Sequence, residues 1–409
     1  MKIFFTIIVI LLAGQIYAQR CATTEYMAKH PQVSNFGAGS RGSSPATGRD
    51  TLPGEVITIP VVVHVLYNNQ SENISDAQII SQLNALNEDF RRQNKDAVNT
   101  PSAFRDVAAD TRITFCLAKV DPSGKPTTGI IRKFTREKAF LADDAMKFSV
   151  SGGDEAWDAS RYLNIWVCNL LGRTLGYAVL PGSPAEKDGV VIKYDAFGTV
   201  GAARLPYNKG RTATHEIGHW LGLRHLWGDA DCGDDGIADT PPQQTSNLYC
   251  TTFPHVSACS INQYGDMFMN FMDFSDDACM NLFTNDQGTA MRSIFAQGQP
   301  RNSFLKTMVC DSSNAVGGPL PPEVEPLQPE VRIYPNPFIN EIQIRANTLA
   351  FAGKNVKVYD AMGKTYINQQ ITGQQTTLQV PQLPAGVYFV RIDGLTKPLV
   401  YKVIRQAKN

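Results

Sequence analysis

The chain has 409 residues, of which 43% are hydrophobic and 19% are charged, and its length predicts two or three folded units. Lys and Arg together number 38, as do Asp and Glu, so the formal net charge is zero. This balance excludes a general attraction to nucleic acid or to an anionic surface, so any specificity must come from a local site.

The N-terminus has the form of a secretory signal. Lys2 supplies a positive charge, residues 3–14 form a short apolar core, and a cleavage point follows Tyr17-Ala18. No later stretch reaches the roughly 18 apolar residues of a membrane span, so we expect no transmembrane segment in the mature protein. We predict that residues 1–18 are a signal peptide and that the protein is secreted, either extracellular or on the outer cell surface. Export also permits disulfides among the eight cysteines.

The segment after the signal is polar and rich in Gly, Ser, Pro and Thr, which predicts an unstructured prosegment over residues 19–48. Cys21 stands beside Arg20 near its start. One interpretation makes Cys21 an ordinary disulfide partner. The other makes it a thiolate that blocks a metal site and keeps an enzyme latent. The residues themselves favour neither.

Strand and helix patterns follow in the next part of the chain. Residues 56–67 (VITIPVVVHVLY) are β-branched and almost wholly apolar, which predicts a buried strand with His64 as a core residue rather than a ligand. Ser75 has the spacing of a helix cap with Gln78, and an apolar stripe continues to about Arg92, which predicts a helix. Further strand-like segments are residues 113–120, 163–170, 176–180 and 190–194. We therefore expect a twisted mixed sheet backed by helices.

The most specific pattern is HEIGHWLGLRH over residues 215–225. His215 and His219 are four apart, so on a helix both imidazoles project from one face, as two ligands of a tetrahedral Zn²⁺ require. Gly222 can take the positive φ that ends a helix, which lets His225 return as a third ligand and leaves the fourth position to water. Glu216 is then placed as the general base. A core helix with satisfied histidines is the competing interpretation, but three of the six histidines lie here.

An acidic segment with cysteines follows the histidines. Its carboxylates and glycines suit a hard cation such as Ca²⁺, although the spacing is not that of an EF-hand and a solvated loop is the alternative. Four cysteines could form two disulfides or a zinc site, and the absence of C-x-x-C pairs and the expected export favour disulfides. These four are Cys232, Cys250, Cys259 and Cys279.

Residues 270–274 (NFMDF) are a candidate Met-turn, with Met272 beneath the metal ligands. A histidine pattern of this form followed by a Met-turn is the signature of the metzincin metallopeptidases. The last ordered element before a linker is expected to be helical, over residues 285–308.

Three motifs together resemble the pappalysin branch of the metzincins over roughly residues 49–310: HEIGHWLGLRH, DGIADTP and NFMDFSDDACM with its interleaved cysteines. The resemblance implies an α+β catalytic domain with a twisted mixed sheet, a zinc helix and an irregular C-terminal subdomain. Its edge strand, residues 176–180, would pair with an extended substrate. The implied disulfides are Cys232–Cys259 and Cys250–Cys279. The implied cofactors are catalytic Zn²⁺ and structural Ca²⁺, the latter at Asp235, Thr240 and Asp239.

The resemblance also implies a zymogen whose Cys21 caps the zinc, which leaves the pairing of the remaining cysteines, Cys116, Cys168 and Cys310, open. The family cleaves on the amino side of Lys or Arg, so a carboxylate must line the S1′ pocket, and Asp276 and Asp277 are the candidates. Such specificity would permit self-activation before Arg41 or Arg49. One departure is Phe274, which stands where the family has a tyrosine whose hydroxyl can stabilise the reaction intermediate.

Residues 311–329 are rich in Pro, Gly and Glu, which predicts a linker. Beyond it, seven short β runs without His or Cys predict a small all-β sandwich over residues 330–409. The segments YPNPF, LPAGVY and KVIR resemble the sorting domain of type IX secretion cargo, which implies the type IX machinery as a partner. A substrate-binding sandwich is the alternative.

The leading hypothesis is a secreted zinc endopeptidase, made as a latent zymogen, that acts on proteins and peptides and not on nucleic acid. A surface adhesion or scaffold protein on a degenerate protease fold is one alternative, and Phe274 alone favours it. A metal-dependent hydrolase of non-peptide esters or amides is another, which the Met-turn and the edge strand disfavour.

Overall fold

The computed structural model describes residues 20–30, 54–311, 331–346, 351–373, 375–380, 383–393 and 397–407. The predicted signal peptide, nearly all of the predicted linker, and Arg41 and Arg49 lie outside these ranges. Within them, no helix is long and apolar enough to cross a membrane.

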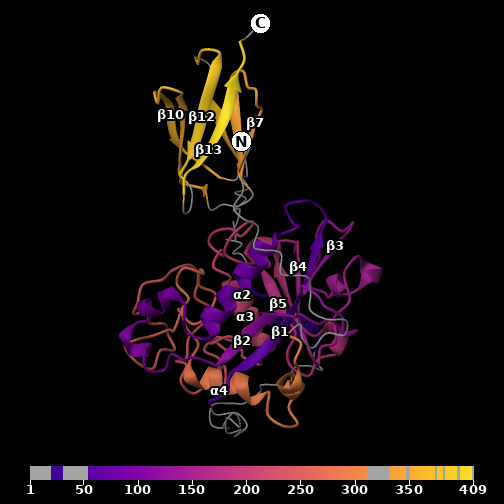
Figure 1. Ribbon diagram of the computed structural model, residues 1–409. Coiled ribbons are helices and arrows are strands. Elements are labelled where there is room, and N and C mark those ends of the chain that lie inside the picture. Colours follow the sequence, from indigo (N-terminus) through magenta and orange to yellow (C-terminus); the bar gives the residue numbers. More distant parts are fainter. Residues whose placement is uncertain are drawn as a thin grey trace, which may run out of the picture.

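The N-terminal unit is built on a six-stranded mixed sheet with the order β2-β1-β4-β6-β5, and β3 also pairs with β1 (Figure 1). Its strands are parallel except β5, which pairs antiparallel with β6 and forms one edge. The strands are β1 (Ile57–Tyr67), β2 (Ile113–Leu117), β3 (Ile130–Phe134), β4 (Leu163–Cys168), β5 (Gly176–Ala178) and β6 (Val190–Lys193). The mixed sheet expected from the sequence is confirmed, and the apolar runs of β1 and β4 fit strands covered on both faces.

Two helices cover one face of this sheet. Helix α2 (Asp76–Phe90) begins where the Ser75 side chain accepts a hydrogen bond from the Gln78 amide, and it buries the apolar stripe seen in the sequence. Helix α3 (Arg211–Trp220) packs against α2 and carries the first two histidines of the motif. Short 3-10 turns connect the elements: η2 (Lys95–Asn99), η3 (Ser102–Phe104), η4 (Ala145–Lys147), η5 (Ser149–Ser151), η6 (Ala185–Lys187), η7 (Tyr194–Ala196) and η8 (Asn302–Lys306).

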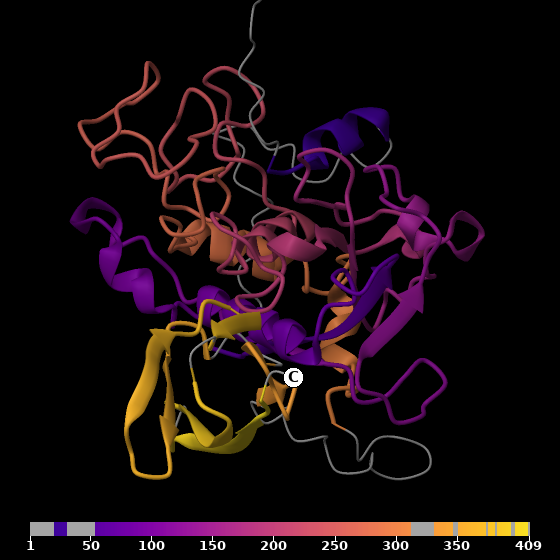
Figure 2. The same cartoon turned by 90° about the horizontal axis from the view of Figure 1, so that it is seen from above.

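Two expectations about helices are wrong. The helix expected over residues 285–308 ends early, as α4 (Asn285–Ser293). Gly298 adopts a positive φ and Pro300 follows, so no helix continues across these positions and only the short turn η8 forms later. The leader is not unstructured throughout, because residues 23–29 form α1 (Thr23–Lys29), which lies beside β5. Figure 2 shows α1, in indigo, next to the magenta middle part of the chain.

The chain between α3 and α4 is irregular and is cross-linked. Its bridges are Cys232–Cys259 and Cys250–Cys279, the pairs that the family resemblance implies. A third bridge, Cys116–Cys310, ties β2 to the C-terminal end of this unit. Cys21 and Cys168 are buried and unbridged. The three remaining cysteines of the sequence thus divide into one bridge and one buried thiol.

The C-terminal unit consists of two antiparallel sheets with the orders β10-β9-β12-β13 and β11-β8-β7, as the predicted sandwich requires (Figure 1). Alternate side chains of these strands meet in one apolar core. Its strands are β7 (Val331–Tyr334), β8 (Glu341–Ala346), β9 (Asn355–Asp360), β10 (Thr365–Gln370), β11 (Gln375–Gln379), β12 (Gly386–Ile392) and β13 (Leu399–Arg405).

Candidate active site

Helix α3 and the turn after it bring three imidazoles together. All ten residues of α3 are buried, and the helix ends just before Gly222, whose φ is +93°. A Cβ at Gly222 would meet only ordinary contacts, at 3.8 and 3.9 Å, so the backbone conformation and not the space requires glycine. This turn returns His225 to the face of α3 that carries the other two histidines. The Nε2 of His225 lies 3.2 Å from His215 Nε2 and 3.0 Å from His219 Nε2.

The three rings are held in one tautomer by their outer nitrogens. His215 Nδ1 lies 2.7 Å from the Phe271 carbonyl oxygen, and His219 Nδ1 lies 2.8 Å from that of Leu223. Because a carbonyl oxygen can only accept, both Nδ1 atoms carry hydrogen and both Nε2 atoms offer lone pairs. Burial lowers the pKa of both rings, to about 3 for His219, which keeps them neutral.

This donor set fits a zinc ion. The Nε2 atoms of His215 and His219 lie 3.1 Å apart, and lone pairs that converge so closely repel one another unless a cation lies between them. Tetrahedral zinc with bonds of about 2.05 Å would set its nitrogens about 3.3 Å apart, close to what is found. The Asp229 carboxylate lies 2.5 Å from the third ligand's outer nitrogen, His225 Nδ1, and so orients that ring.

Cys21 from the leader completes the cluster. Its Sγ and the three histidine nitrogens all lie within 4.8 Å of one another, the one such cluster of His, Cys, Asp or Glu within the described ranges. The leader runs parallel to the edge strand β5 at this point, where Cys21 bridges Gly176 and the Ala22 amide donates to the Gly176 carbonyl. Burial raises the pKa of the Cys21 thiol.

The Glu216 carboxylate faces the same point as the cluster. Its Oε2 accepts hydrogen bonds from Cys21 Sγ at 3.4 Å and from the Thr23 hydroxyl at 3.0 Å, while its Oε1 is buried without a partner. Burial raises the pKa of Glu216 to about 8. A carboxylate in this environment is poised to exchange a proton with a group bound at the cluster.

Residues 270–274 form the floor of the site. Met272 is fully buried, and a Cβ on Gly218 would collide with its Sδ, so the helix and the Met-turn touch through a glycine. The ring of Phe274 lies 4.8 Å from that of His225 and 4.9 Å from that of Trp227, centre to centre. Phe274 therefore contributes aromatic packing beside a ligand and no hydrogen-bond donor.

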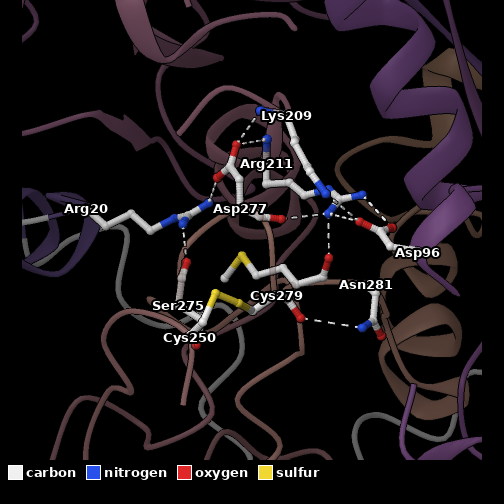
Figure 3. The surroundings of a disulfide bond; sticks show 10 residues. Arg20, Asp96, Lys209, Arg211, Cys250, Ser275, Asp277, Cys279 and Asn281 are labelled. Atoms are coloured by element: carbon white, nitrogen blue, oxygen red, sulfur yellow. Dashed lines mark hydrogen bonds and ion pairs between the residues drawn. A yellow bond between two sulfur atoms is a disulfide. The ribbon is translucent and has the colours of Figure 1, made fainter. Parts of the chain in front are cut away.

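Of the two carboxylates predicted for the S1′ pocket, Asp277 is the one that binds a cation (Figure 3). The guanidinium of Arg20, buried with Asp277, donates to its Oδ1 at 2.8 Å and also to the Ser275 carbonyl. Asp277 Oδ2 accepts from the backbone amides of Lys209 and Arg211, at 2.8 and 3.2 Å. Backbone amides at and just before the start of α3 therefore hold one oxygen of Asp277, and Arg20 of the leader binds the other.

The three residues predicted to bind calcium do not all meet. The Thr240 hydroxyl lies 2.9 Å from both oxygens of Asp235, which are buried with it. Asp239 instead accepts from the Thr284 hydroxyl at 2.6 Å and from the Asp286 amide at 2.9 Å, at the start of α4. Asp235 and Thr240 therefore lie together, whereas the Asp239 carboxylate is bound by residues at the start of α4.

Several residues at the site were missed from the sequence. The sequence identifies Arg20 only as a neighbour of Cys21, and it gives no signal for Thr23. Asp229 belongs to the acidic segment that follows the histidines, yet its carboxylate orients His225. Only Asp229 had a usable signal, because it lies four residues after His225 and so within reach of its outer nitrogen.

The fold and the site define a metallopeptidase of the metzincin type. The family described as "Pregnancy-associated plasma protein-A" matches residues 150–296, and the family described as "Secretion system C-terminal sorting domain" matches residues 332–406. An extracellular metalloprotease of Colletotrichum graminicola is 31% identical over 315 residues, which cover 73% of this chain and 99% of that protein. A second, from Pyricularia oryzae, is 30% identical over 289 residues, which cover 68% and 89%.

Solved structures give the same result. Mirolysin in complex with a compound is 54% identical, with 61% of this chain and 96% of that chain covered and a TM-score of 0.60. A Tannerella forsythia promirolysin mutant is 47% identical, with 70% and 97% covered and a TM-score of 0.65. The chain belongs to the pappalysin family of metallopeptidases, peptidase family M43, and carries a C-terminal sorting domain for type IX secretion. It is a secreted metallopeptidase with a zymogen form, and its localisation and enzyme class agree with the sequence-based predictions.

Proposed function

We propose that this chain is the latent precursor of a zinc endopeptidase that cleaves proteins and peptides before arginine or lysine. The observation that carries this proposal is the position of Arg20, one residue from the Cys21 thiol that meets the three histidines. Its guanidinium is buried against Asp277. The leader thus presents the charge of a basic side chain to a pocket beside the metal site.

The catalytic groups are assigned from their geometry. His215, His219 and His225 would hold the zinc, with Met272 beneath them. Bound zinc would acidify a water and polarise the scissile carbonyl. Glu216 would take a proton on its Oε2 and deliver it to the leaving amine. Both proton transfers would use the Glu216 carboxylate, whose Oε2 is bound by Cys21 and Thr23 of the leader.

Latency follows from what the leader occupies. Cys21 takes the fourth position of the metal site, and Thr23 bonds to the Glu216 oxygen that the proton must reach. The backbone of the leader also takes the edge of β5, through the Ala22 amide. A substrate would need all three places, so the leader must leave before cleavage. We propose release by cleavage before Arg41 or Arg49.

Asp277 would set the specificity. A buried carboxylate that is held by two backbone amides gains most from a substrate cation that replaces Arg20. A neutral P1′ side chain would leave that charge without a partner. Asp276 lies beside this carboxylate and less deeply, so we assign it a minor part.

Calcium and the division of the chain are further parts of the proposal. Asp235 and Thr240 would supply oxygen ligands to a structural Ca²⁺, with Asp239 only after a rearrangement. The chain would divide into a signal peptide (1–18), a prosegment (19–48), the catalytic domain (49–310), a linker (311–329) and the sorting domain (330–409). The last would be removed after passage through the type IX machinery.

The test is digestion of casein by the protein freed of its leader, with and without a zinc chelator. We expect cleavage that the chelator abolishes and that Glu216→Ala removes. N-terminal sequencing of the released peptides should give Arg or Lys as the first residue. Absence of chelator-sensitive cleavage would favour a scaffold protein on a degenerate fold.

A further inference from the structure

A second leader side chain, Tyr26 of α1, fills a pocket that the catalytic mechanism does not use. Tyr26 is 2% exposed, and its ring stacks on that of Tyr177, with centres 5.2 Å apart. Its hydroxyl donates to Asp144 Oδ2 at 2.7 Å. The other walls are side chains of the catalytic unit, among them Met146 and Lys147, whose Nζ lies 5.8 Å from the centre of the Tyr26 ring.

The pocket is held together by bonds within the catalytic unit. Asp144 Oδ1 accepts from the Tyr177 hydroxyl at 2.9 Å and pairs with Lys147 Nζ at 2.8 Å. Lys147, itself fully buried, also donates to the Lys187 carbonyl at 2.7 Å. None of these bonds involves the leader, so the walls and the acceptor stay in place when the leader leaves.

We propose that this pocket is a non-primed subsite of the mature peptidase that accepts a tyrosine side chain of the substrate. The inference rests on the proposed function, because it takes the Asp277 pocket as S1′. Arg20 lies at that pocket and Cys21 at the metal site, so Tyr26, further along the leader, lies on the opposite side of the scissile bond. The subsite would thus read residues that precede the cleaved bond.

The edge strand brings a substrate to this pocket. Successive side chains of a strand point to opposite faces of a sheet. On β5, a Cβ at Gly176 would approach Glu216, whereas Tyr177 lies on the other face and forms the pocket wall. An extended substrate paired with β5 alternates in the same way. At least one of its non-primed side chains therefore points toward the face of Tyr177.

The charges around Asp144 select a neutral donor. Lys147 and Lys187 already lie 2.8 and 3.4 Å from its two oxygens, so a third cation would be repelled. A phenol supplies one hydrogen bond and no charge, and it also stacks on Tyr177. Burial, together with the Asp144 carboxylate, raises the pKa of the Tyr26 phenol, so that group remains a donor. Phenylalanine would fill the space but would remove the phenol donor of Asp144 Oδ2, which would keep only Lys187 at 3.4 Å.

The first test compares peptides on the mature enzyme. Each peptide carries Arg at P1′, and Tyr, Phe, Leu or Lys is placed in turn at each of the four non-primed positions. At one position we expect kcat/KM for Tyr to exceed that for Phe by about tenfold, the size of one hydrogen bond to a charged acceptor, with Lys poorest. Equal values for Tyr and Phe at all four positions would overturn the proposal.

A matched pair of variants locates the effect. Asp144 has a φ of +69°, which asparagine tolerates, so Asp144→Asn keeps the backbone and removes the charge. It should bring the ratio of Tyr to Phe close to one, whereas Asp143→Asn, at the exposed neighbour, should leave it unchanged. A full Tyr preference in folded Asp144→Asn would contradict the assignment. If that variant does not fold, the peptide comparison decides.

A binding measurement separates this inference from the proposed function. A synthetic peptide of residues 20–30 is titrated into the mature protein by calorimetry, and its Tyr26→Phe form should bind about tenfold more weakly. Weaker binding of the Tyr26→Phe peptide, with no cleavage of any substrate, would support the tyrosine pocket and contradict the proposed peptidase activity. Cleavage before Arg, with equal binding of the two peptides and no preference for Tyr, would retain the peptidase and refute the pocket.

Discussion

The hydroxyl of Thr23 donates a hydrogen bond to Glu216 Oε2 at 3.0 Å. It also accepts one from the Ala178 amide of β5 at 2.9 Å, so one leader side chain joins the proposed general base to the edge strand. Valine has the same shape without the hydroxyl. In the zymogen, Thr23→Val removes the acceptor of the buried Ala178 amide and leaves Glu216 Oε2 with only its hydrogen bond from Cys21 Sγ, which weakens the hold of the leader.

We expect Thr23→Val to shorten the lag before activation severalfold, since a lost buried hydrogen bond costs about 1–3 kcal/mol. Cys21→Ala should shorten it further. The measurement is the rate at which activity appears when a trace of mature enzyme is added. Glu25→Gln, at an exposed position of the same helix, is the control and should keep the normal lag. An unchanged lag in Thr23→Val would show that its hydroxyl plays no part in latency.

Asp277→Asn should lower kcat/KM for peptides with Arg at P1′ roughly 30-fold or more. This corresponds to a loss of about 2 kcal/mol of transition-state binding, because a desolvated charge pair is lost. Peptides with Leu at P1′ should lose much less. Asp276→Asn is the matched control, and its specificity should remain close to that of the native enzyme. A similar loss for both peptides would mean that Asp277 supports the fold and not the specificity. Melting temperatures of both variants complete the comparison.

The sequence was most informative where the interacting residues are close together along the chain. The metal cluster depends on helix geometry and one glycine turn between His215 and His225, so its local spacing sufficed. Arg20 and Asp277 are 257 residues apart, and Tyr26 and Asp144 are 118 apart. Only the folded sheet and its edge strand bring such pairs together, and composition or periodicity carries no signal for them.

Local patterns also failed where packing decided the outcome. Strand β3 was not predicted, because its sequence IIRKF has basic residues among its apolar ones, and it forms by pairing with β1. Helix α1 was not predicted, because a short polar segment becomes ordered only through the burial of Tyr26. In contrast, the described part of the C-terminal unit has seven strands, as many as the predicted β runs, because their alternation and turn residues are local.

Asp273 should make the catalytic unit less stable as the pH rises through about 6. Burial raises the pKa of this carboxyl to about 6 from an ordinary 3.8, despite hydrogen bonds from Asn247 and Gln243. The folded state therefore holds the proton more tightly than the unfolded state. The contribution is fully present below about pH 4 and is lost as the pH rises through 6, by at most about 3 kcal/mol.

The pH dependence is measured by urea unfolding at pH 4 and pH 7 of Glu216→Ala protein, which we expect not to digest itself. Tryptophan fluorescence reports on the catalytic unit, because all four tryptophans lie between residues 157 and 227. Asp273→Asn cannot titrate. The free energy of unfolding of the parent minus that of this variant should therefore fall by up to about 3 kcal/mol from pH 4 to pH 7. The same difference at both pH values would show that Asp273 titrates alike in both states.

Calcium should raise the melting temperature of the catalytic unit through Asp235. Ligand bound only by the folded state adds stability that grows with its concentration. Asp235→Asn removes a buried carboxylate and should abolish the response to millimolar Ca²⁺. Asp231→Asn changes an exposed carboxylate of the same segment and should retain it. A full response in Asp235→Asn would place the ion elsewhere.

Phe274→Tyr should raise turnover. The ring of Phe274 lies beside those of His225 and Trp227, so Phe274→Tyr adds a hydroxyl to a ring that packs against a proposed metal ligand. A donor that stabilises an oxyanion is worth on the order of 10²–10³ in kcat, and it acts on the transition state more than on bound substrate. We therefore expect kcat to rise at least tenfold with little change in KM, measured on one peptide with Arg at P1′. Phe274→Leu, which supplies no donor either, should show no rise. Unchanged turnover in Phe274→Tyr would mean that another group already stabilises the oxyanion.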